Sequence, residues 1–298
     1  MLSKQEQAEM AKHLRSTTVV PTELPADLVA CLDAVDHKEM LIPTRVGETR
    51  TILVKPRNVE KKAPLFINFH GGGFVRGYQE RDTIFCAMLA SKLGCVVIDV
   101  DYRLSPEFPF PTALHEAYDV TQFAFSNAEE LGIDPDRIAI GGHSAGGNLT
   151  AAVCLMIKQE GGSMPCLQIL DYPFLDAVTD SFVKIGDDPT FFTPERLDGF
   201  NSLHVPKLAD RRNPLMSPVL AKPEMLEGLP SALIIIAAKD ILRHEAECYA
   251  RMLVDAGVEV RLRKFLQSDH GFIIANLAEY RQAHALILKA LKEAFGLR

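Results

Sequence analysis

A serine between two glycines, at the junction of an expected strand and an expected helix, constrains this chain more than any other feature. Residues Gly142-His143-Ser144-Ala145-Gly146 match the pattern G-x-S-x-G. Strand-like apolar residues precede them at 137–140, and apolar residues recur at helical spacing over 145–158. Glycine on both sides lets neighbouring backbone pass close to a tight turn. Ser144 is therefore predicted to project its hydroxyl from a strained strand-to-helix turn, the alternative being an ordinary turn capped by serine.

The rest of the chain alternates short β-branched runs with longer helical patterns, which predicts a doubly wound, mostly parallel sheet covered by helices on both faces. The first two of eight expected strands are joined by four residues, 45–48, and should form an antiparallel hairpin at one edge. The strands are expected near 38–44, 49–56, 64–69, 95–100, 137–140, 166–170, 232–236 and 258–264, and the helices near 82–93, 112–131, 145–158, 245–256 and 279–295.

Two stretches fall outside this alternation, and we interpret both as a cap. The second stretch lies between two expected sheet strands. Insertions at such points lie over the carboxyl edge of the strands, where ligands of α/β proteins bind. The expected division is a core of residues 32–173 and 230–298 and a cap of residues 1–31 and 174–229.

Charge and composition argue against several classes of partner. The net charge of −7, with no basic cluster, leaves no electrostatic footprint for nucleic acid or an anionic membrane. The longest strongly apolar stretch, 232–238, is too short to cross a bilayer, and the N-terminus lacks the apolar region of a signal peptide. The six cysteines form no C-x-x-C pair, so reduced thiols are expected. Without a signal peptide or a membrane-spanning stretch the expected compartment is the cytoplasm, and neither a metal nor a cofactor is expected.

A run of three glycines follows the expected strand 64–69. Backbone amides without side chains can stabilise a tetrahedral oxyanion, and Gly72, Gly73 and Ala145 are the expected donors. A phosphate loop is the competing interpretation, because 72–77 matches G-x-x-x-x-G. Tyr78-Gln79 stands where Lys and Ser/Thr should follow, and Arg76 replaces the last glycine of a dinucleotide motif. Nucleotide binding is therefore not favoured.

A serine nucleophile needs a base and an acid. Of the downstream histidines, His270 follows the last expected strand in a loop and precedes a glycine, whereas His204, His244 and His284 are typical of surface or core positions. Asp240 follows the buried strand 232–238 at its C-terminal edge and is the expected acid, with Glu245 and Asp269 as rivals. His143 should point away from Ser144 and serve packing. The sequence His244-Glu245 only resembles a zinc motif, since its second histidine is missing.

Four blocks resemble the hormone-sensitive-lipase-like, or bacterial family IV, carboxylesterases of the α/β-hydrolase superfamily. They are His70 to Phe74, Asp101 to Pro111, Asp134 to Leu149, and Asp240 with His270-Gly271-Phe272. The resemblance spans about residues 55–290. It implies an α/β-hydrolase fold with a helical cap, the triad Ser144, His270 and Asp240, and an oxyanion hole of Gly72, Gly73 and Ala145. The chain departs from the family pattern at His143 and His244. Within the second block we expect Arg103 and Glu107 to form a buried ion pair.

The expected activity is hydrolysis of short-chain, small-molecule esters, from acetyl to roughly hexanoyl, because no interfacial helix is recognisable. A deacetylase of acetylated sugars or an amidase using the same triad is the alternative, and a catalytically inactive receptor is disfavoured because no triad residue is missing. The sequence leaves a homodimer open. Four aromatic residues are candidates for the substrate pocket: Tyr172, Phe174, Phe191 and Phe192.

Overall fold

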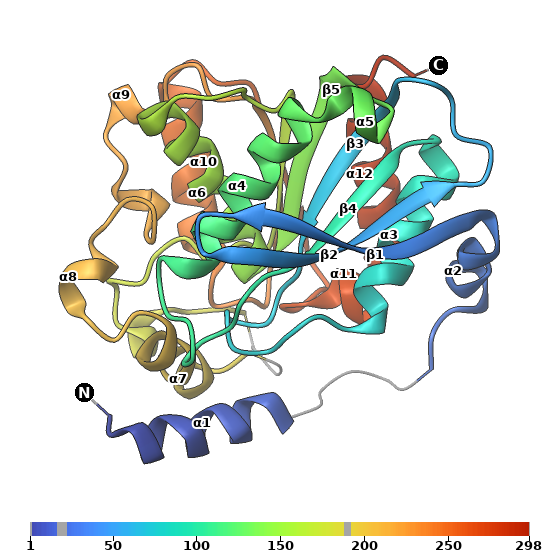
Figure 1. Cartoon of the computed structure of the whole chain (residues 1–298). Coiled ribbons are helices and arrows are strands. Elements are labelled where there is room, and N and C mark those ends of the chain that lie inside the picture. The colour runs from blue at the N-terminus through green and yellow to red at the C-terminus, as the bar shows by residue number, and fades with distance from the viewer. Residues whose placement is uncertain (1, 17–22, 188–191, 298) are drawn as a thin grey trace.

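The computed structural model describes residues 2–16, 23–187 and 192–297, and its centre is one eight-stranded sheet (Figure 1). The strand order is β1-β2-β4-β3-β5-β6-β7-β8. β1 and β2 form the predicted antiparallel hairpin at one edge, β2 pairs antiparallel with β4, and all other neighbours are parallel. The predicted mostly parallel sheet is thus confirmed. The strands are β1 Val35–Thr44, β2 Gly47–Pro56, β3 Ala63–Phe69, β4 Val96–Asp101, β5 Ile133–His143, β6 Leu167–Asp171, β7 Ser231–Ala237 and β8 Val260–Phe265.

Two apolar layers cover the sheet because successive side chains of a strand point to opposite faces. Leu65 and Ile67 of β3 pack with α4 (Thr112–Ser126), α6 (Ala145–Glu160) and α10 (Arg243–Asp255). Phe66, between them in sequence, packs with α3 (Glu80–Leu93) and α12 (Tyr280–Ala294) on the other face. Burial on both faces explains why these strands read as continuous apolar runs.

One expected helix is interrupted. The pattern over 112–131 predicts a single helix, whereas α4 ends at Ser126 and a separate turn, α5, covers Ala128–Leu131. Asn127 separates them: its side-chain amide donates to the carbonyl of Phe123 at 2.9 Å, and so does its backbone N–H. A short polar side chain that competes for backbone carbonyls favours a break at this position.

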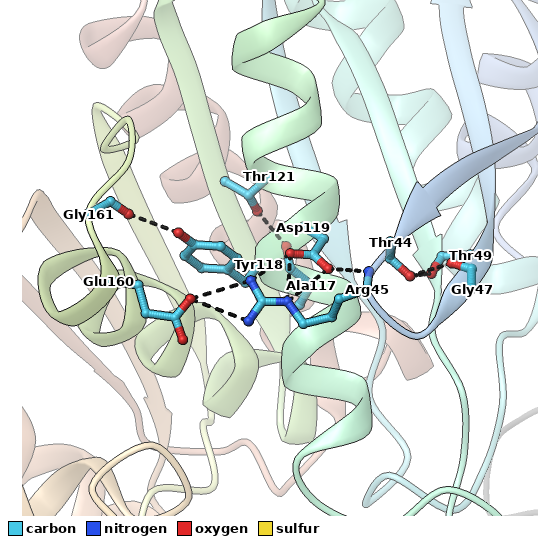
Figure 2. Close-up of polar contacts among 10 residues, drawn as sticks. All are labelled: Thr44, Arg45, Gly47, Thr49, Ala117, Tyr118, Asp119, Thr121, Glu160 and Gly161. Carbon is cyan, nitrogen blue, oxygen red and sulfur yellow. Dashed lines mark hydrogen bonds and ion pairs between the residues drawn. The ribbon is translucent and has the colours of Figure 1, made fainter.

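The hairpin turn is attached to the helical layer through Arg45 (Figure 2). Its guanidinium lies 2.8 Å from Asp119 on α4 and 3.3 Å from Glu160 at the end of α6, and its backbone N–H also donates to Asp119, at 2.7 Å. The Arg45 guanidinium is partly exposed, so each ion pair stabilises the fold only modestly. Together they fix the end of the edge hairpin against both helices.

The N-terminal segment divides between two places. α1 (Lys4–Ser16) lies at the far end of the molecule beside α7 (Pro194–His204), where Leu14 and Met10 approach Gly199 (Figure 1). α2 (Ala26–Val29) and the short helix η1 (Ala30–Ala34) lie against α3, with Leu28 in the same apolar layer. The remaining short helices are η2 (Ser181–Val183), α8 (Leu208–Arg211), η3 (Pro218–Leu220), α9 (Pro223–Leu226) and α11 (Phe272–Ala275).

The expected Arg103–Glu107 ion pair is wrong. Arg103 pairs with Glu116, a fully buried carboxylate on α4 that also accepts from Thr49. Glu107 is largely exposed and instead pairs with Arg15 of α1 at 2.6 Å. Helix α4 holds Glu116 in a fully buried position, and a buried carboxylate requires a charged partner more than an exposed one does.

Candidate active site

Ser144 occupies a sharp turn between β5 and α6. Its backbone is left-handed, with φ 56° and ψ −109°, a conformation that costs free energy for a residue with a Cβ atom. The flanking glycines are required by contact: a Cβ at Gly146 would lie 1.8 Å from the carbonyl oxygen of Phe69, and one at Gly142 would lie 2.5 Å from the same atom. The turn therefore forces the Ser144 side chain out of the strand and above the sheet edge.

The structure brings Ser144, His270 and Asp240 together, although they come from three different loops. His270 Nε2 lies 2.8 Å from Ser144 Oγ, and His270 Nδ1 lies 2.7 Å from Asp240 Oδ2. The second carboxylate oxygen of Asp240 accepts from the Leu242 N–H at 2.9 Å. All three residues are buried, with 7%, 6% and 1% exposure respectively. A serine hydroxyl in contact with an imidazole that a carboxylate orients is the arrangement that nucleophilic acyl transfer requires.

The two rival acids lie elsewhere. Glu245 is buried on α10, accepts from the Leu175 N–H at 2.6 Å and pairs with Lys184. Burial raises the pKa of Glu245 to about 7. Asp269 accepts a bond from the backbone N–H of its neighbour His270 at 2.6 Å, not from the imidazole.

The three other histidines downstream of Ser144 make different contacts. His204 bonds Ser105 Oγ at 2.8 Å and stacks on Phe74, and burial lowers its pKa to about 3. His284 is buried against Phe85, with a pKa lowered by burial to about 4. His244 is exposed and lies 3.3 Å from Glu247.

His143, next to the serine, lies in a buried contact with an acidic residue of the neighbouring strand. Its Nδ1 is 3.0 Å from Asp171 Oδ2, and both side chains are 2% exposed. The register of β5 and β6 places these two residues opposite each other. Burial raises the pKa of Asp171, whereas its hydrogen bond to His143 opposes that shift. His143 thus joins two strands below the turn and makes no contact with the Ser144 hydroxyl among the hydrogen bonds of the described residues.

The glycine loop lies beside the serine. Gly72 and Gly73 have φ values of 121° and 61°, which favour glycine. The loop is closed by bonds from the N–H groups of Val75 and Arg76 to the carbonyl of Gly72, at 3.1 and 2.9 Å. Within the described part of the chain, the amides of Gly72, Gly73 and Ala145 donate to no other group. They therefore remain available to a developing oxyanion.

Two cavities meet at Ser144. The larger cavity, of about 100 Å³, is lined by His270, Tyr172 and the glycine loop. The smaller cavity, of about 10 Å³, is apolar and is lined by Ala145 and Phe174. Phe192 lines both cavities, whereas Phe191 lies outside the described residues. Sequence reasoning missed the contributions of Arg76, Arg196 and Phe200 to these walls. Arg76 alone had a local signal, because it follows the glycine run by three residues.

Asp99, a buried acid below the active site, allows the effect of burial on a pKa to be tested. Asp99 of β4 is fully buried and accepts from Asn68 Nδ2 at 2.8 Å, and desolvation raises its pKa to about 6 from an ordinary value of 3.8. The folded state therefore binds more protons than the unfolded state between these two values. This contribution to stability is complete below pH 3.8 and is lost as the pH rises through about 6.

We expect Asp99→Asn, which does not titrate, to gain stability relative to the parent chain as the pH rises. The difference in free energy of unfolding should grow by about 3 kcal/mol between pH 4 and pH 7.5. Urea unfolding at both pH values measures it, with the exposed Asp36→Asn as the matched control. An equal difference at the two pH values would contradict the buried, titrating Asp99.

Across 2–16, 23–187 and 192–297, no group of three histidine, cysteine or acidic side chains is arranged to hold a metal ion. No helix in these ranges has both the length and the apolar character needed to cross a membrane.

Comparison with known proteins agrees with the geometry. A family model described as the alpha/beta hydrolase fold matches residues 66–274. The chain is 37% identical over 247 residues to the carboxylic ester hydrolase LipN of Mycobacterium tuberculosis, a match that covers 80% of this chain and 65% of LipN, slightly under two thirds of that protein. It is 32% identical over 262 residues to an arylesterase of Saccharolobus solfataricus, covering 84% and 85% of the two chains.

An esterase of Pyrobaculum calidifontis has a similar solved structure, with a TM-score of 0.82, 32% identity and coverage of 98% of this chain and 94% of that one. The fold and site thus define a member of the α/β-hydrolase family. Within it, the chain belongs to the hormone-sensitive-lipase-like branch of carboxylic ester hydrolases.

Proposed function

We propose that this protein is a serine carboxylesterase that hydrolyses short-chain acyl esters through an acyl-enzyme intermediate. The observation that carries the proposal is the continuous chain of contacts from Asp240 through His270 to Ser144, at 2.7 and 2.8 Å, on a strained turn beside free backbone amides. The proposed nucleophile is Ser144, the base His270 and the acid Asp240, with an oxyanion hole of Gly72, Gly73 and Ala145.

The proposed reaction has two halves, acylation of Ser144 and hydrolysis of the acyl-enzyme, and both halves use the same groups. His270 Nε2 takes the proton of Ser144 Oγ as this oxygen attacks the ester carbonyl, and the backbone amides stabilise the oxyanion. His270 then gives the proton to the leaving alcohol oxygen, and the C–O bond of the ester breaks. In the second half, water attacks the acyl-enzyme with His270 as base, releasing the acid and restoring Ser144. Asp240 holds the imidazole in the required tautomer throughout.

The two cavities suggest where each half of the ester binds. The leaving oxygen must lie on the side of His270, because this residue protonates it. The larger cavity is lined by His270 and Gly271, so we assign it to the alcohol part of the ester. The smaller one contains Ala145 but not His270, and its walls include Phe74, Phe174 and Leu197. Its apolar walls suit an acyl group of few carbons.

The cap remains part of the proposal. We propose that residues 1–31 and 174–229 cover the core of residues 32–173 and 230–298. In support, α7 supplies Arg196, Leu197 and Phe200 to the cavity walls. Helix α1 packs on α7, and Arg15 donates to the carbonyl of Val75 at 3.0 Å, next to the glycine loop.

A series of p-nitrophenyl esters from acetate to decanoate, with acetylated sugars and acetanilides alongside, tests the proposal. We expect kcat/KM to be highest for acetate to hexanoate and to fall by at least about tenfold at decanoate. Faster cleavage of the sugars or the amides than of the simple esters would favour the deacetylase or amidase alternative instead.

Leu197→Ala tests the acyl assignment. Leu197 lines the small cavity, and its truncation should move the preferred chain length upward by about two carbons, since each buried methylene contributes about 0.8 kcal/mol. The matched control is Leu203→Ala on the same helix, a buried leucine that lines neither cavity, which should lose stability without changing the profile. A common shift in both variants would refute the assignment.

A further inference from the structure

The imidazole of His270 is covered by an aromatic ring. The Phe192 ring lies nearly parallel to it, with 4.4 Å between the two ring centres and 20° between the two planes. Both side chains are buried, each with 6% exposure. Tyr172 approaches the same imidazole at a steeper angle, 63°, with 5.0 Å between the ring centres. Because both imidazole nitrogens are already hydrogen-bonded, to Asp240 and Ser144, the stacked Phe192 ring contacts the remaining surface, the face of the imidazole.

The local sequence fixes where Phe192 lies. Thr193 is the N-cap of α7 and accepts from the Arg196 N–H at 3.4 Å, and Pro194 occupies the first turn. Phe192 thus precedes the N-cap, the position whose apolar side chain commonly packs against the fourth residue of the helix, here Leu197. Phe192 and Leu197 line the same small cavity. The start of α7 therefore directs the Phe192 ring toward the active site.

A second ring on α7 supports this placement. The Phe200 ring lies nearly parallel to the Phe192 ring, with 6.2 Å between the ring centres and 17° between the planes. Both phenylalanines are buried, and both line the two cavities that meet at Ser144. Close packing against a second buried ring restricts the rotation of the Phe192 side chain, so its contact with His270 is maintained.

The stacked contact favours the charged form of the base. His270 becomes an imidazolium each time it takes a proton, and the face of a phenyl ring attracts a cation within about 6 Å of the ring centre. A neutral imidazole gains less from a parallel phenyl ring, because two aromatic faces of like charge oppose each other. An interaction that is stronger in the charged transition state than in the ground state accelerates the reaction.

We propose that Phe192 is a positioning residue for His270: its ring holds the imidazole in line with Ser144 and Asp240 and stabilises the imidazolium formed in both halves of the reaction. This inference rests on the proposed function, in which His270 is the base. Rotation of the imidazole would break its bonds to both neighbours, and a ring packed on its face opposes that rotation. The role differs from that of a cavity wall, because a wall acts on substrate binding and this contact acts on the base.

Fluorination of the Phe192 ring tests the electrostatic part of the proposal at nearly constant shape. Singly, triply and fully fluorinated phenylalanine at position 192 withdraw electrons from the ring face in steps. Hydrolysis of p-nitrophenyl acetate is measured from about pH 5 to pH 9. We expect the plateau kcat to fall stepwise, by about tenfold in total. The acid-side midpoint of kcat/KM should move stepwise to lower pH, by about 1 pH unit in total, since a less stable imidazolium leaves the neutral base present at lower pH.

Two ordinary substitutions accompany the series. Phe192→Leu removes the ring but keeps an apolar side chain, and it should match the fully fluorinated variant. Phe192→Tyr keeps an electron-rich ring and should retain most of the activity and the parent midpoint. In all of these variants kcat should change more than KM, and a thermal melt reports whether each variant is folded.

The matched control is Phe85, an equally buried ring that packs against two other histidines. Its ring centre lies 4.8 Å from that of His143 and 5.6 Å from that of His284. Phe85→Leu should lower the thermal midpoint of unfolding without moving the acid-side midpoint of kcat/KM. Fully fluorinated phenylalanine at position 85 should change neither kcat nor that midpoint.

The charged groups near His270 are the same in the parent chain and in every variant at position 192. Asp240 faces Nδ1 of the imidazole, and Asp269 accepts from the His270 backbone. The charged and titratable groups that line the larger cavity with His270 are Arg76, Arg81, Asp82, His143, Tyr172 and Arg196. Their contribution to the pH profile is common to all these proteins, so a stepwise shift along the fluorinated series reports on the ring at position 192.

The outcomes distinguish this inference from the proposed function. If kcat and the acid-side midpoint stay constant along the fluorinated series, the inference is wrong and the esterase proposal stands, even where Phe192→Leu alone loses activity, because the ring then serves only packing. If the parent chain does not hydrolyse p-nitrophenyl acetate, or does so with a flat pH profile, the proposed function itself is wrong.

Discussion

Ser144→Ala should abolish ester hydrolysis while leaving the fold intact. Without the hydroxyl that contacts His270 Nε2, only substrate binding and the oxyanion donors remain, and kcat should fall by about 10⁶-fold. Alanine keeps the Cβ that the left-handed turn already accommodates, so the thermal unfolding midpoint should change little. Initial rates with p-nitrophenyl acetate, together with a thermal melt, measure both quantities.

The control for this variant is Ser91→Ala on α3, where the hydroxyl only bonds the carbonyl of Met88 at 3.2 Å. It should retain full activity. A phosphonate directed at serine nucleophiles should add one label to the parent chain, at Ser144, and none to Ser144→Ala. If the alanine variant kept a tenth of the activity, the serine mechanism would be excluded.

Asp240→Asn should produce the second largest loss, about 10⁴-fold in kcat. The carboxylate accepts from His270 Nδ1 at 2.7 Å, which leaves Nε2 free to take the serine proton. An asparagine amide that donates to Nδ1 stabilises the opposite tautomer, and it cannot stabilise the imidazolium that forms during catalysis.

Two matched amide substitutions test the choice of acid. Glu245→Gln and Asp269→Asn change the other candidate carboxylates, and each should cost far less than Asp240→Asn in kcat. Glu245→Gln removes a buried partner of Lys184, so its main effect should be on stability and should appear in the thermal melt. A larger kinetic loss for Glu245→Gln than for Asp240→Asn would show that the acid is wrongly assigned.

Features that depend on a short segment were predictable from the sequence. The turn at Ser144 needs its two glycines because they contact the carbonyl of Phe69 on the adjacent strand, so a five-residue pattern carries the constraint. The parallel sheet was equally accessible, since strands buried on both faces are apolar throughout. Asp240 follows such a strand, β7, whereas His270 follows the more exposed edge strand β8.

Features that depend on packing between distant segments were not predictable from the sequence. Arg103 has an acid four residues away and another thirteen away, and only the buried position of α4 decides in favour of Glu116. The cavity walls formed by Arg196 and Phe200 require α7 to lie over the glycine loop, which no local pattern encodes. The break at Asn127 depends on a competition between hydrogen bonds that helical spacing does not reveal.

The contact between Gly73 and α7 links two properties that enzyme engineers usually treat separately. A Cβ at Gly73 would lie 2.4 Å from the Phe200 ring, so this ring rests directly on the backbone of Gly73. The same ring is a wall of the small apolar cavity. Enlarging that cavity through Phe200 would therefore also loosen the loop that carries a proposed oxyanion donor. Selectivity and turnover are coupled at this position, and Leu197, which does not touch the loop in this way, offers the more independent route to a broader substrate range.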